Sequence, residues 1–380
     1  MEKREERNVS LDLLKIIGMF LIVCIHFVGY NKLIDITAEG SSNYIAMLII
    51  NAVCMLAVPC YFLISGYFLC KSRFRCKKIL KIWGVTLFYS LLFLVLFTIL
   101  GISLSTQKWI NSIFPVLSGS YWFVSAYILL YFLFPFLNLI IHKITQKQYQ
   151  VLLGILLVAN CICATIFPIN TIFDATSGLS IVYAIFLYLV AAYIRMYKTD
   201  SIKASKRKWI YFVLFVLFMM IQVINFYQLD PIRGQSSLTA IFANRAFSYN
   251  SIFCFIASVS LFLFFININI KNKIAKETIL YFRPLLFAVY LIHSNPIVTD
   301  FLWNIINGRQ YATWNMWSLV GVTLGISFLL FILCIGIEVI RKGIFYLIGR
   351  LRVFQKIDGF LTVQYNKLDA ILDIDSIKKS

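Results

Sequence analysis

The chain has 380 residues, of which 61% are hydrophobic and only 13% are charged, and it contains 35 phenylalanines. Soluble domains are closer to half apolar, so this composition excludes an ordinary soluble protein and predicts an all-α polytopic membrane protein. The formal net charge is +19, but the positive side chains gather in short segments between apolar runs, which is typical of topology signals and contact with anionic membrane lipids rather than nucleic-acid binding.

Apolar runs that are long enough to cross a bilayer recur along the chain. We expect about ten spans, at residues 10–30, 45–70, 82–103, 121–141, 151–168, 179–197, 209–228, 248–270, 285–305 and 317–340. Lys and Arg concentrate in every second connecting segment, such as 71–81, which predicts that these segments and both termini are cytoplasmic. We expect one transmembrane domain over 1–345 and a cytoplasmic tail over 346–380.

The first apolar run carries three titratable side chains. Asp12 and Lys15 are three residues apart, and His26 follows Lys15 by eleven. At about 100° per residue these spacings put all three on one helix face, with His26 roughly 17 Å beyond Lys15. Asn8 or Ser10 can cap the start of this helix. Ionisable groups in a span usually face the bundle interior or water, so the face predicts one wall of a reaction chamber.

The alternative for the same face is structural. Asp12 and Lys15 would then be interfacial residues, with the lysine reaching the lipid headgroups, and His26 would form an ordinary hydrogen bond between helices. Spacing alone leaves both interpretations open.

The second apolar run ends in a small-residue pair and a dense basic segment. Ser65 and Gly66 are small enough to let helices approach closely. Arg73 and Arg75 follow among other basic residues, and guanidinium groups match the oxygens of a phosphate in pairs. The segment therefore suits a phosphorylated ligand, although basic cytoplasmic loops also serve as topology signals.

Two later runs hold further candidates. Tyr121 and Trp122 begin the fourth run on its outer side, where aromatic residues usually form the membrane-surface belt but can also stack on a sugar ring. In the ninth run His293 precedes Ser294–Pro296, which predicts a helix distortion beside a titratable ring. We keep His293 as a second polar site, with a polar contact between helices as the alternative.

The remaining titratable and thiol groups predict no metal site. Seven of the nine cysteines lie inside apolar runs, and Cys161 and Cys163, which are two residues apart, have no His or carboxylate close in sequence, so we expect reduced thiols, no metal and no bound cofactor. Glu338 and Arg341 are three residues apart near the end of the last run, which predicts an ordinary ion pair.

Four segments resemble the acyltransferase-3 family of integral membrane acyltransferases, many of which O-acetylate surface polysaccharides. They are the opening Arg7–Lys15 segment followed by His26, FLISGYFL with the downstream Arg73 and Arg75, YWFVSAYILLYFLFPFL, and VYLIH ending at His293. In this order they cover almost the whole chain. The family usually has Arg where this chain has Lys15, so the charge is kept but the planar guanidinium group is lost.

The resemblance implies an acyl-CoA donor bound from the cytoplasmic side and an acceptor hydroxyl presented from within or across the membrane. We expect transfer of an acyl group, acetyl or succinyl, to a cell-envelope glycan or lipid-linked sugar at the cell membrane. The expected general base is His26, and the expected second polar site is His293. Donor binding is expected from Asp12, Lys15, Arg73 and Arg75, and acceptor binding from Tyr121 and Trp122.

Two other functions fit the same pattern. A transporter or exporter of an organic anion or glycan precursor would use the same hydrated passage and leave its substrate chemically unchanged. No internal repeat is visible, which weakens that alternative. A membrane sensing module is the least favoured. Acyl-CoA consumption by the purified protein separates the enzyme from the transporter, and the sequence leaves a homo-oligomer open.

Overall fold

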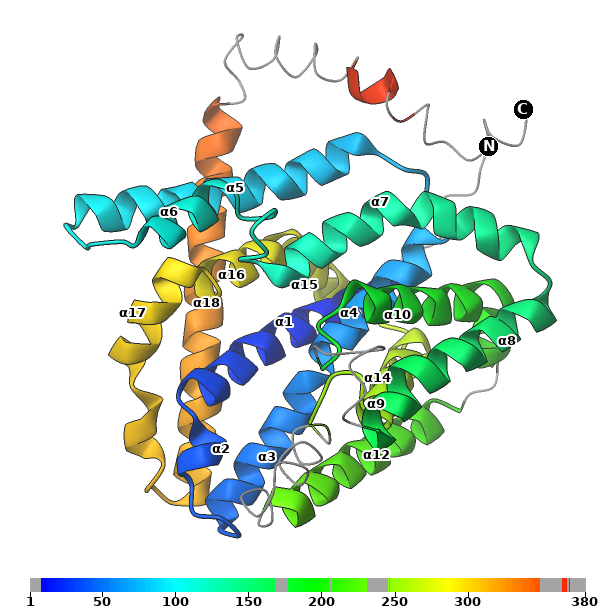
Figure 1. Cartoon of the computed structure of the whole chain (residues 1–380), viewed down its shortest axis with the longest axis horizontal. Helices are drawn as coiled ribbons and strands as arrows, with labels where there is room; N and C mark the ends of the chain where they lie inside the picture. The colour runs from blue at the N-terminus through cyan, green and yellow to red at the C-terminus, as the bar shows by residue number, and fades with distance from the viewer. Residues whose placement is uncertain are drawn as a thin grey trace. The chain divides into compact units, whose positions relative to one another are not determined.

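The computed structural model describes residues 8–167, 177–204, 207–230, 245, 247–348, 364–367 and 369. Within these residues every regular element is a helix, as the composition predicts (Figure 1). Eight helical segments are long and apolar enough to cross a membrane, and three of these, Ser42–Leu69, Gln146–Ile166 and Ile181–Ile202, each join consecutive helices. The bent pair Lys273–His293 and Pro296–Tyr311 adds a ninth if it forms one span. The number ten and the cytoplasmic position of both termini stay predictions, and most of the predicted tail over 346–380 lies outside the described residues.

The chain forms two compact units, of which the first comprises Met1–Tyr67, Gln150–Leu286 and Asn307–Leu329. Its described helices, some of which continue into the second unit, are α1 (Val9–Tyr30), α2 (Leu33–Ile36), α3 (Ser42–Met55), α4 (Ala57–Leu69), α8 (Gln146–Leu157), η1 (Val158–Ile162), α9 (Cys163–Ile166), α10 (Ile181–Tyr193), η2 (Ile194–Lys198), α11 (Thr199–Ala204), α12 (Lys208–Leu229), α14 (Ile252–Ile266), α15 (Lys273–Phe282), η4 (Arg283–Leu285), η5 (Gly308–Tyr311) and α18 (Met316–Ile348).

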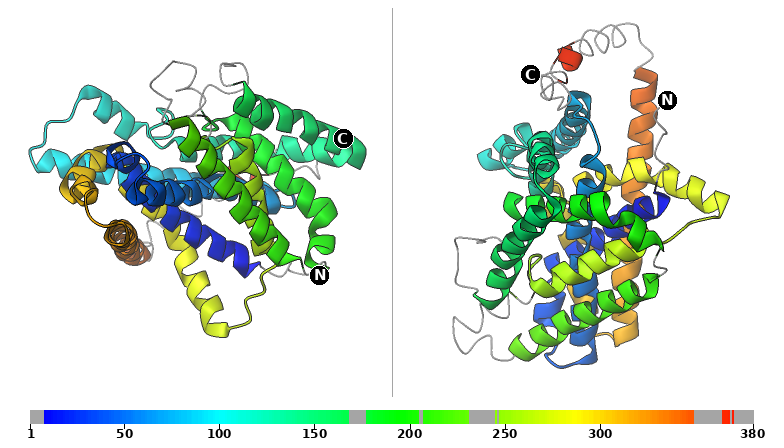
Figure 2. Two further views of the ribbon diagram at one scale, coloured as in Figure 1. Left: turned by 90° about the horizontal axis from the view of Figure 1, so that it is seen from below. Right: turned by 90° about the vertical axis from the view of Figure 1, so that its right-hand side faces the viewer.

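The core of the first unit forms where long helices lie side by side. Helix α12 packs along α14, and α3 packs against both α1 and α12, as Figures 1 and 2 show. Apolar side chains three or four residues apart make the contact between α3 and α12, namely Tyr44, Leu48 and Ala52 on the former and Met219, Val223 and Phe226 on the latter. This spacing puts each set on one helix face, so burial of one face against the other follows from the helical period.

Gly66 allows the close helix approach that the small pair Ser65–Gly66 predicts. A Cβ atom added at Gly66 would lie 2.4 Å from the backbone oxygen of Tyr188 and 2.7 Å from its Cα. Tyr188 is buried in α10, so the backbones of α4 and α10 are nearly in contact at this point. Backbone atoms held in a helix cannot move aside as a flexible side chain can, and this position therefore requires glycine.

Replacing Gly66 by alanine should destabilise the protein because the added methyl group forces two helix backbones apart. We expect a loss of about 1–3 kcal/mol in the free energy of unfolding, the usual cost of overpacking a core. Thermal unfolding of purified protein measures the loss. Gly84→Ala is the matched control, since a Cβ there meets nothing within 4 Å. Equal melting temperatures for the two variants would contradict the close packing.

The second unit comprises Phe68–Tyr149, Phe287–Ile306 and Leu330–Ser380. Its further described helices are α5 (Cys76–Ile99), α6 (Thr106–Ile113), α7 (Trp122–Lys143), α16 (Leu286–His293) and α17 (Pro296–Ile306). Helix α5 contacts α6, α7 and α17. Lys108 of α6 pairs with Asp300 of α17.

A buried ion pair joins α5 to the second half of α18. Arg341 donates from Nε and Nη2 to the two carboxylate oxygens of Glu338, at 2.7 Å each, which confirms the pair predicted from their spacing. Tyr89 of α5 donates a third hydrogen bond to Glu338 at 2.7 Å. The residue Glu338 is only 2% exposed, and a charge so deeply buried requires such a set of partners.

Candidate functional site

The polar face of α1 begins with a buried ion pair. Lys15 Nζ donates to Asp12 Oδ1 at 3.2 Å, and Asp12 is only 3% exposed. This contact confirms that the two side chains share a face. Tyr61 of α4 donates to the backbone oxygen of Lys15 at 2.6 Å, so the same turn is also fixed from outside the helix. A buried carboxylate is stable only with such a partner, and Lys15 supplies it.

Two side chains form hydrogen bonds at the start of α1, one within the helix and one to another helix. Asn8 is the N-cap, and its Oδ1 accepts a hydrogen bond from the backbone nitrogen of Leu11 at 3.3 Å. Ser10 donates to the backbone oxygen of Phe265 at 2.6 Å. Of the two residues that could cap this helix, Asn8 therefore does so, while Ser10 ties α1 to the end of α14.

His26 lies one turn before the end of α1, and its side chain is half-buried within the protein. The helix is unbroken from Val9 to Tyr30, so the spacing that places His26 on the face of Lys15 holds. The imidazole meets the ring of Tyr30 edge-on, with centroids 5.8 Å apart and an angle of 77°. The role of His26 as a base stays a prediction.

In the second unit, a buried aromatic residue orients the two arginines. Arg73 and Arg75 are exposed, and Phe74 between them is buried against Tyr131 and Phe134 of α7, with ring centroids 5.4 and 6.2 Å apart. Arg75 has extended backbone angles, φ −143° and ψ 107°, immediately before α5. Successive side chains of an extended segment point to opposite sides, so burial of Phe74 directs both guanidinium groups away from the core.

The N-terminus of α5 holds a carboxylate in this structure. The backbone nitrogen of Cys76, the first residue of α5, donates to Asp369 Oδ1 at 2.6 Å. Unpaired N–H groups and the helix dipole attract anions to such a position. The guanidinium groups of Arg73 and Arg75 precede it in the chain and add positive charge. The position is therefore suited to an anionic group of a ligand.

The chain bends at His293, as the sequence predicts. Helix α16 ends there, α17 begins at Pro296, and the axis turns by 81° across the break. His293 is fully buried, and its Nδ1 donates to the backbone oxygen of Val289 at 2.5 Å, while Nε2 lies 3.3 Å from Ser294 Oγ. These contacts hold the ring at the carboxyl end of its own helix, and the role of His293 as a second polar site stays a prediction.

Asn295 joins this bend to Tyr121. Its Oδ1 accepts from the backbone nitrogen of Ile297 at 2.8 Å, and its Nδ2 donates to Tyr121 Oη at 2.7 Å. Tyr121 in turn donates to the backbone oxygen of Leu291 at 3.1 Å and is fully buried. Its ring would have to be uncovered before it could stack on a sugar, whereas Trp122 is half-buried. Acceptor binding by these two aromatic residues stays a prediction.

Two of these contacts were not predicted from the sequence. Asn295 is a helix cap, and its position directly before Pro296 is the local signal that could have identified it, because proline is favoured at the first position of a helix. Asp369 carries no such signal, since its partner Cys76 is far away in the sequence.

Comparison with protein families identifies this chain. The family model described as an acyltransferase domain matches residues 8–338, which include α1, both arginines and the bend at His293. Comparison with curated proteins and with solved structures found no match. The family match covers nearly the whole chain, and the described part contains several helices that can span a membrane. The chain therefore belongs to the acyltransferase-3 family and is a membrane acyltransferase.

Proposed function

We propose that this membrane acyltransferase moves an acyl group, with acetyl as the first candidate, from acyl-CoA to a hydroxyl of a cell-envelope glycan or lipid-linked sugar at the cell membrane. The family match over residues 8–338 is the observation that carries the proposal. The polar face of α1 supports it, because a buried Asp12–Lys15 pair and a half-buried His26 lie on one helix that can cross the membrane.

His26 is the proposed general base. Its neutral imidazole accepts the proton of the acceptor hydroxyl as that oxygen attacks the thioester carbonyl, which forms the new C–O bond. The C–S bond then breaks, and the imidazolium returns the proton to the departing sulfur of coenzyme A. The products are the acyl ester and free coenzyme A, and the histidine ends in its starting state.

The proposed donor-binding residues are Arg73, Arg75, Lys15 and Asp12. Arg73 and Arg75 pair with the phosphates of coenzyme A, since each guanidinium offers two parallel donors to phosphate oxygens. Lys15, which donates a hydrogen bond to Asp12, is proposed to contribute its positive charge to donor binding at the entry end of the passage. Asp12 orients Lys15. His293 is the proposed second polar group and orients the acceptor or the thioester.

Labelled acetyl-CoA incubated with the purified protein and a membrane glycolipid fraction tests the proposal directly. Release of free coenzyme A and mass analysis of the glycolipid should show one acetyl group added per coenzyme A released. Movement of unmodified glycolipid or of an organic anion across vesicles, without release of coenzyme A, would instead support the transporter and overturn the proposed transfer.

Asp369→Asn should increase the affinity for acyl-CoA. The Asp369 carboxylate is bound at the α5 N-terminus. This position directly follows Arg73 and Arg75, which are proposed to bind the phosphates of the donor, so the carboxylate and a phosphate compete for it. We expect the KM for acyl-CoA to fall about two- to fivefold, which corresponds to the 0.3–1 kcal/mol typical of one charge at a helix terminus. Glu277→Gln is the control, because it removes one exposed carboxylate from α15. An unchanged KM in Asp369→Asn would contradict the competition.

A further inference from the structure

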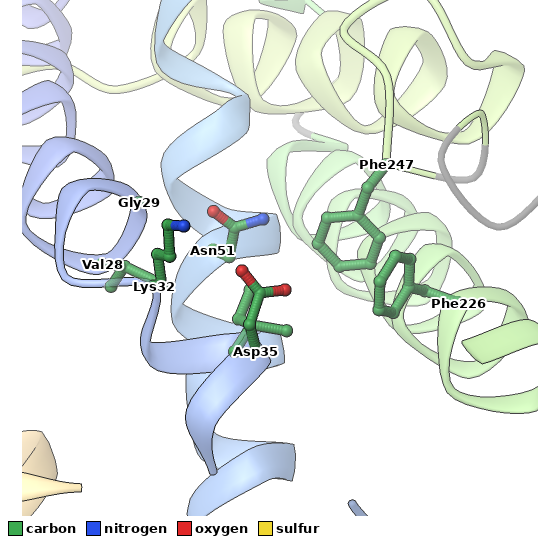
Figure 3. Close-up of a pocket in the computed structure, with 8 residues that line it drawn as sticks. Val28, Gly29, Lys32, Asp35, Asn51, Phe226 and Phe247 are labelled. Carbon is green, nitrogen blue, oxygen red and sulfur yellow. The ribbon is translucent and has the colours of Figure 1, made fainter. Parts of the chain in front are cut away.

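Polar and aromatic side chains line a cavity of about 210 Å³ in the first unit. Lys32 and Asp35 belong to the turn and short helix α2 that follow α1, Asn51 comes from α3, and Phe226 and Phe247 lie across from them. Figure 3 shows the ammonium, carboxylate and amide groups directed toward the same space, with the two rings on the other side.

The polar groups of this cavity are accessible to a ligand, since Lys32 and Asp35 are exposed and Asn51 is half-buried. The side chains of Lys32, Asp35 and Asn51 form no ion pair or hydrogen bond with another described residue. Together they offer the donors of an ammonium, the acceptors of a carboxylate, and both kinds of group on an amide. Converging groups of this kind in a concave site are the usual means by which a protein orients a polar ligand.

The backbone around Lys32 is rigidly held in an uncommon conformation. Lys32 has φ 53° and ψ 37°, in the left-handed region that a lysine seldom adopts. Asn31 beside it is buried, and it donates to the backbone oxygen of Phe27 at 2.9 Å and accepts from the backbone nitrogen of Gly308 at 2.7 Å. Such a conformation persists where surrounding contacts enforce it, and here it presents Lys32 to the cavity.

The aromatic wall gives the cavity its second chemical property. Phe226 is 6% exposed and meets the ring of Phe247 edge-to-face, with centroids 4.5 Å apart. An apolar wall opposite hydroxyl-binding groups matches a pyranose ring, which has an apolar C–H face and a rim of hydroxyls. The volume of about 210 Å³ is below the roughly 300 Å³ at which drug-sized sites begin, so it suits one sugar ring.

The cavity also lies beside the proposed base. Gly29 lines it, and Gly29 follows His26 by three residues on the unbroken helix α1. Residues three apart share a helix face and differ by about 4.5 Å along the axis. The residue that carries the proposed base is therefore one helical turn from a residue that lines the cavity.

We propose that this cavity binds one pyranose ring of the acceptor, with Asp35, Asn51 and Lys32 on its hydroxyls and the Phe226–Phe247 wall on its apolar face. The assignment rests on the proposed function and specifies where its acceptor binds. It places acceptor recognition in the first unit, next to His26, on side chains that sequence analysis did not connect.

Kinetics with two varied substrates test the assignment on the full-length protein in lipid. Labelled acetyl-CoA is the donor, and the membrane glycolipid fraction is the acceptor. Asp35→Asn and Asn51→Ala should each raise the acceptor KM about tenfold, the size expected when one hydrogen bond to a buried or charged group is lost. The donor KM should stay constant. Phe226→Leu, which keeps an apolar side chain but removes the ring, should also raise the acceptor KM.

Glu39→Gln is the matched control for Asp35→Asn. Glu39 is exposed, lies four residues further along the chain and does not line the cavity, so its variant loses the same charge nearby. It should keep the wild-type acceptor KM. A wild-type acceptor KM in Asp35→Asn would overturn the assignment, because the cavity carboxylate would then not contribute to acceptor binding. Equal increases of the acceptor KM in Asp35→Asn and Glu39→Gln would also overturn it, because the increase would then not depend on the cavity.

A binding measurement tests sugar binding in the cavity independently of the proposed acyl transfer. Saturation-transfer NMR with methyl β-D-glucopyranoside and methyl β-D-N-acetylglucosaminide reports sugar contact without turnover. A signal that is lost in Asp35→Asn and kept in Glu39→Gln supports the cavity, even if no coenzyme A is released and the proposed function fails. Absence of any signal in the wild-type protein, or an undiminished signal in Asp35→Asn, would overturn the assignment.

Discussion

Replacing His26 by alanine should reduce acyl transfer about 10²- to 10⁴-fold, the range by which a positioned general base accelerates a reaction. The acceptor hydroxyl would lose the group that accepts its proton, while α1 would keep its cap and its Asp12–Lys15 pair, which involve other residues. The measurement is the rate of acetyl transfer to the glycolipid fraction at saturating substrates, with the amount of protein in the membrane determined for each variant.

Two further substitutions make this result specific to proton transfer. His26→Gln keeps a polar side chain of similar size but cannot act as a base near neutral pH, so its rate should fall as far as that of His26→Ala. His142→Ala removes a histidine from the last turn of α7, where Nδ1 only contacts the backbone oxygen of Asn138, and it should transfer at the wild-type rate. Full activity in His26→Gln would exclude the imidazole from the proton transfer.

The double variant Arg73→Gln/Arg75→Gln should raise the KM for acyl-CoA by about 100-fold or more. Each substitution removes a charge-assisted hydrogen bond to a phosphate, and such bonds contribute about 1.5–3 kcal/mol apiece. The change should leave the fold intact, because both guanidinium groups are exposed and Phe74 still fills its place against α7. Steady-state kinetics with varied acetyl-CoA measure the effect.

Two double variants distinguish specific phosphate binding from general attraction. Lys143→Gln/Lys147→Gln removes two exposed positive charges from another segment predicted to be cytoplasmic, and its donor KM should change less than about twofold because distant exposed charges are screened by salt. Arg73→Lys/Arg75→Lys keeps the charges but loses the planar donors, so an intermediate KM is expected. Equal effects of the glutamine variants at both places would contradict a phosphate site at the two arginines.

Several features of this protein follow from the sequence because they depend on neighbouring residues alone. The predicted spans 10–30 and 121–141 agree with α1, Val9–Tyr30, and α7, Trp122–Lys143, within two residues. The Asp12–Lys15 contact follows from helical spacing in the same way. The bend after His293 follows from the adjacent proline, since proline cannot continue the hydrogen bonding of a preceding helix.

Other boundaries depended on contacts that local sequence does not reveal. The predicted span 45–70 agrees with the helical segment Ser42–Leu69, in which only Leu56 separates α3 from α4, but the predicted span 248–270 contains the shorter helix Ile252–Ile266. Ser251 caps the start of that helix by accepting from the backbone nitrogen of Cys254 at 3.1 Å. Hydropathy measures only whether a segment is apolar, so it cannot locate a cap inside an apolar run.

The amino-acid sequence by itself determined that the protein is helical and membrane-spanning and which polar residues share a helix face, because composition and helical period are properties of a continuous chain. The acyltransferase assignment came from the resemblance of its motifs to a family, which the family match confirms. Only the tertiary structure decided which of those faces are covered. Tyr121 is buried by residues about 170 positions away, and Lys32, Asp35 and Asn51 meet at one cavity because α1, α2 and α3 pack together. Burial and convergence depend on partners distant in sequence, and spacing along one helix carries no information about them.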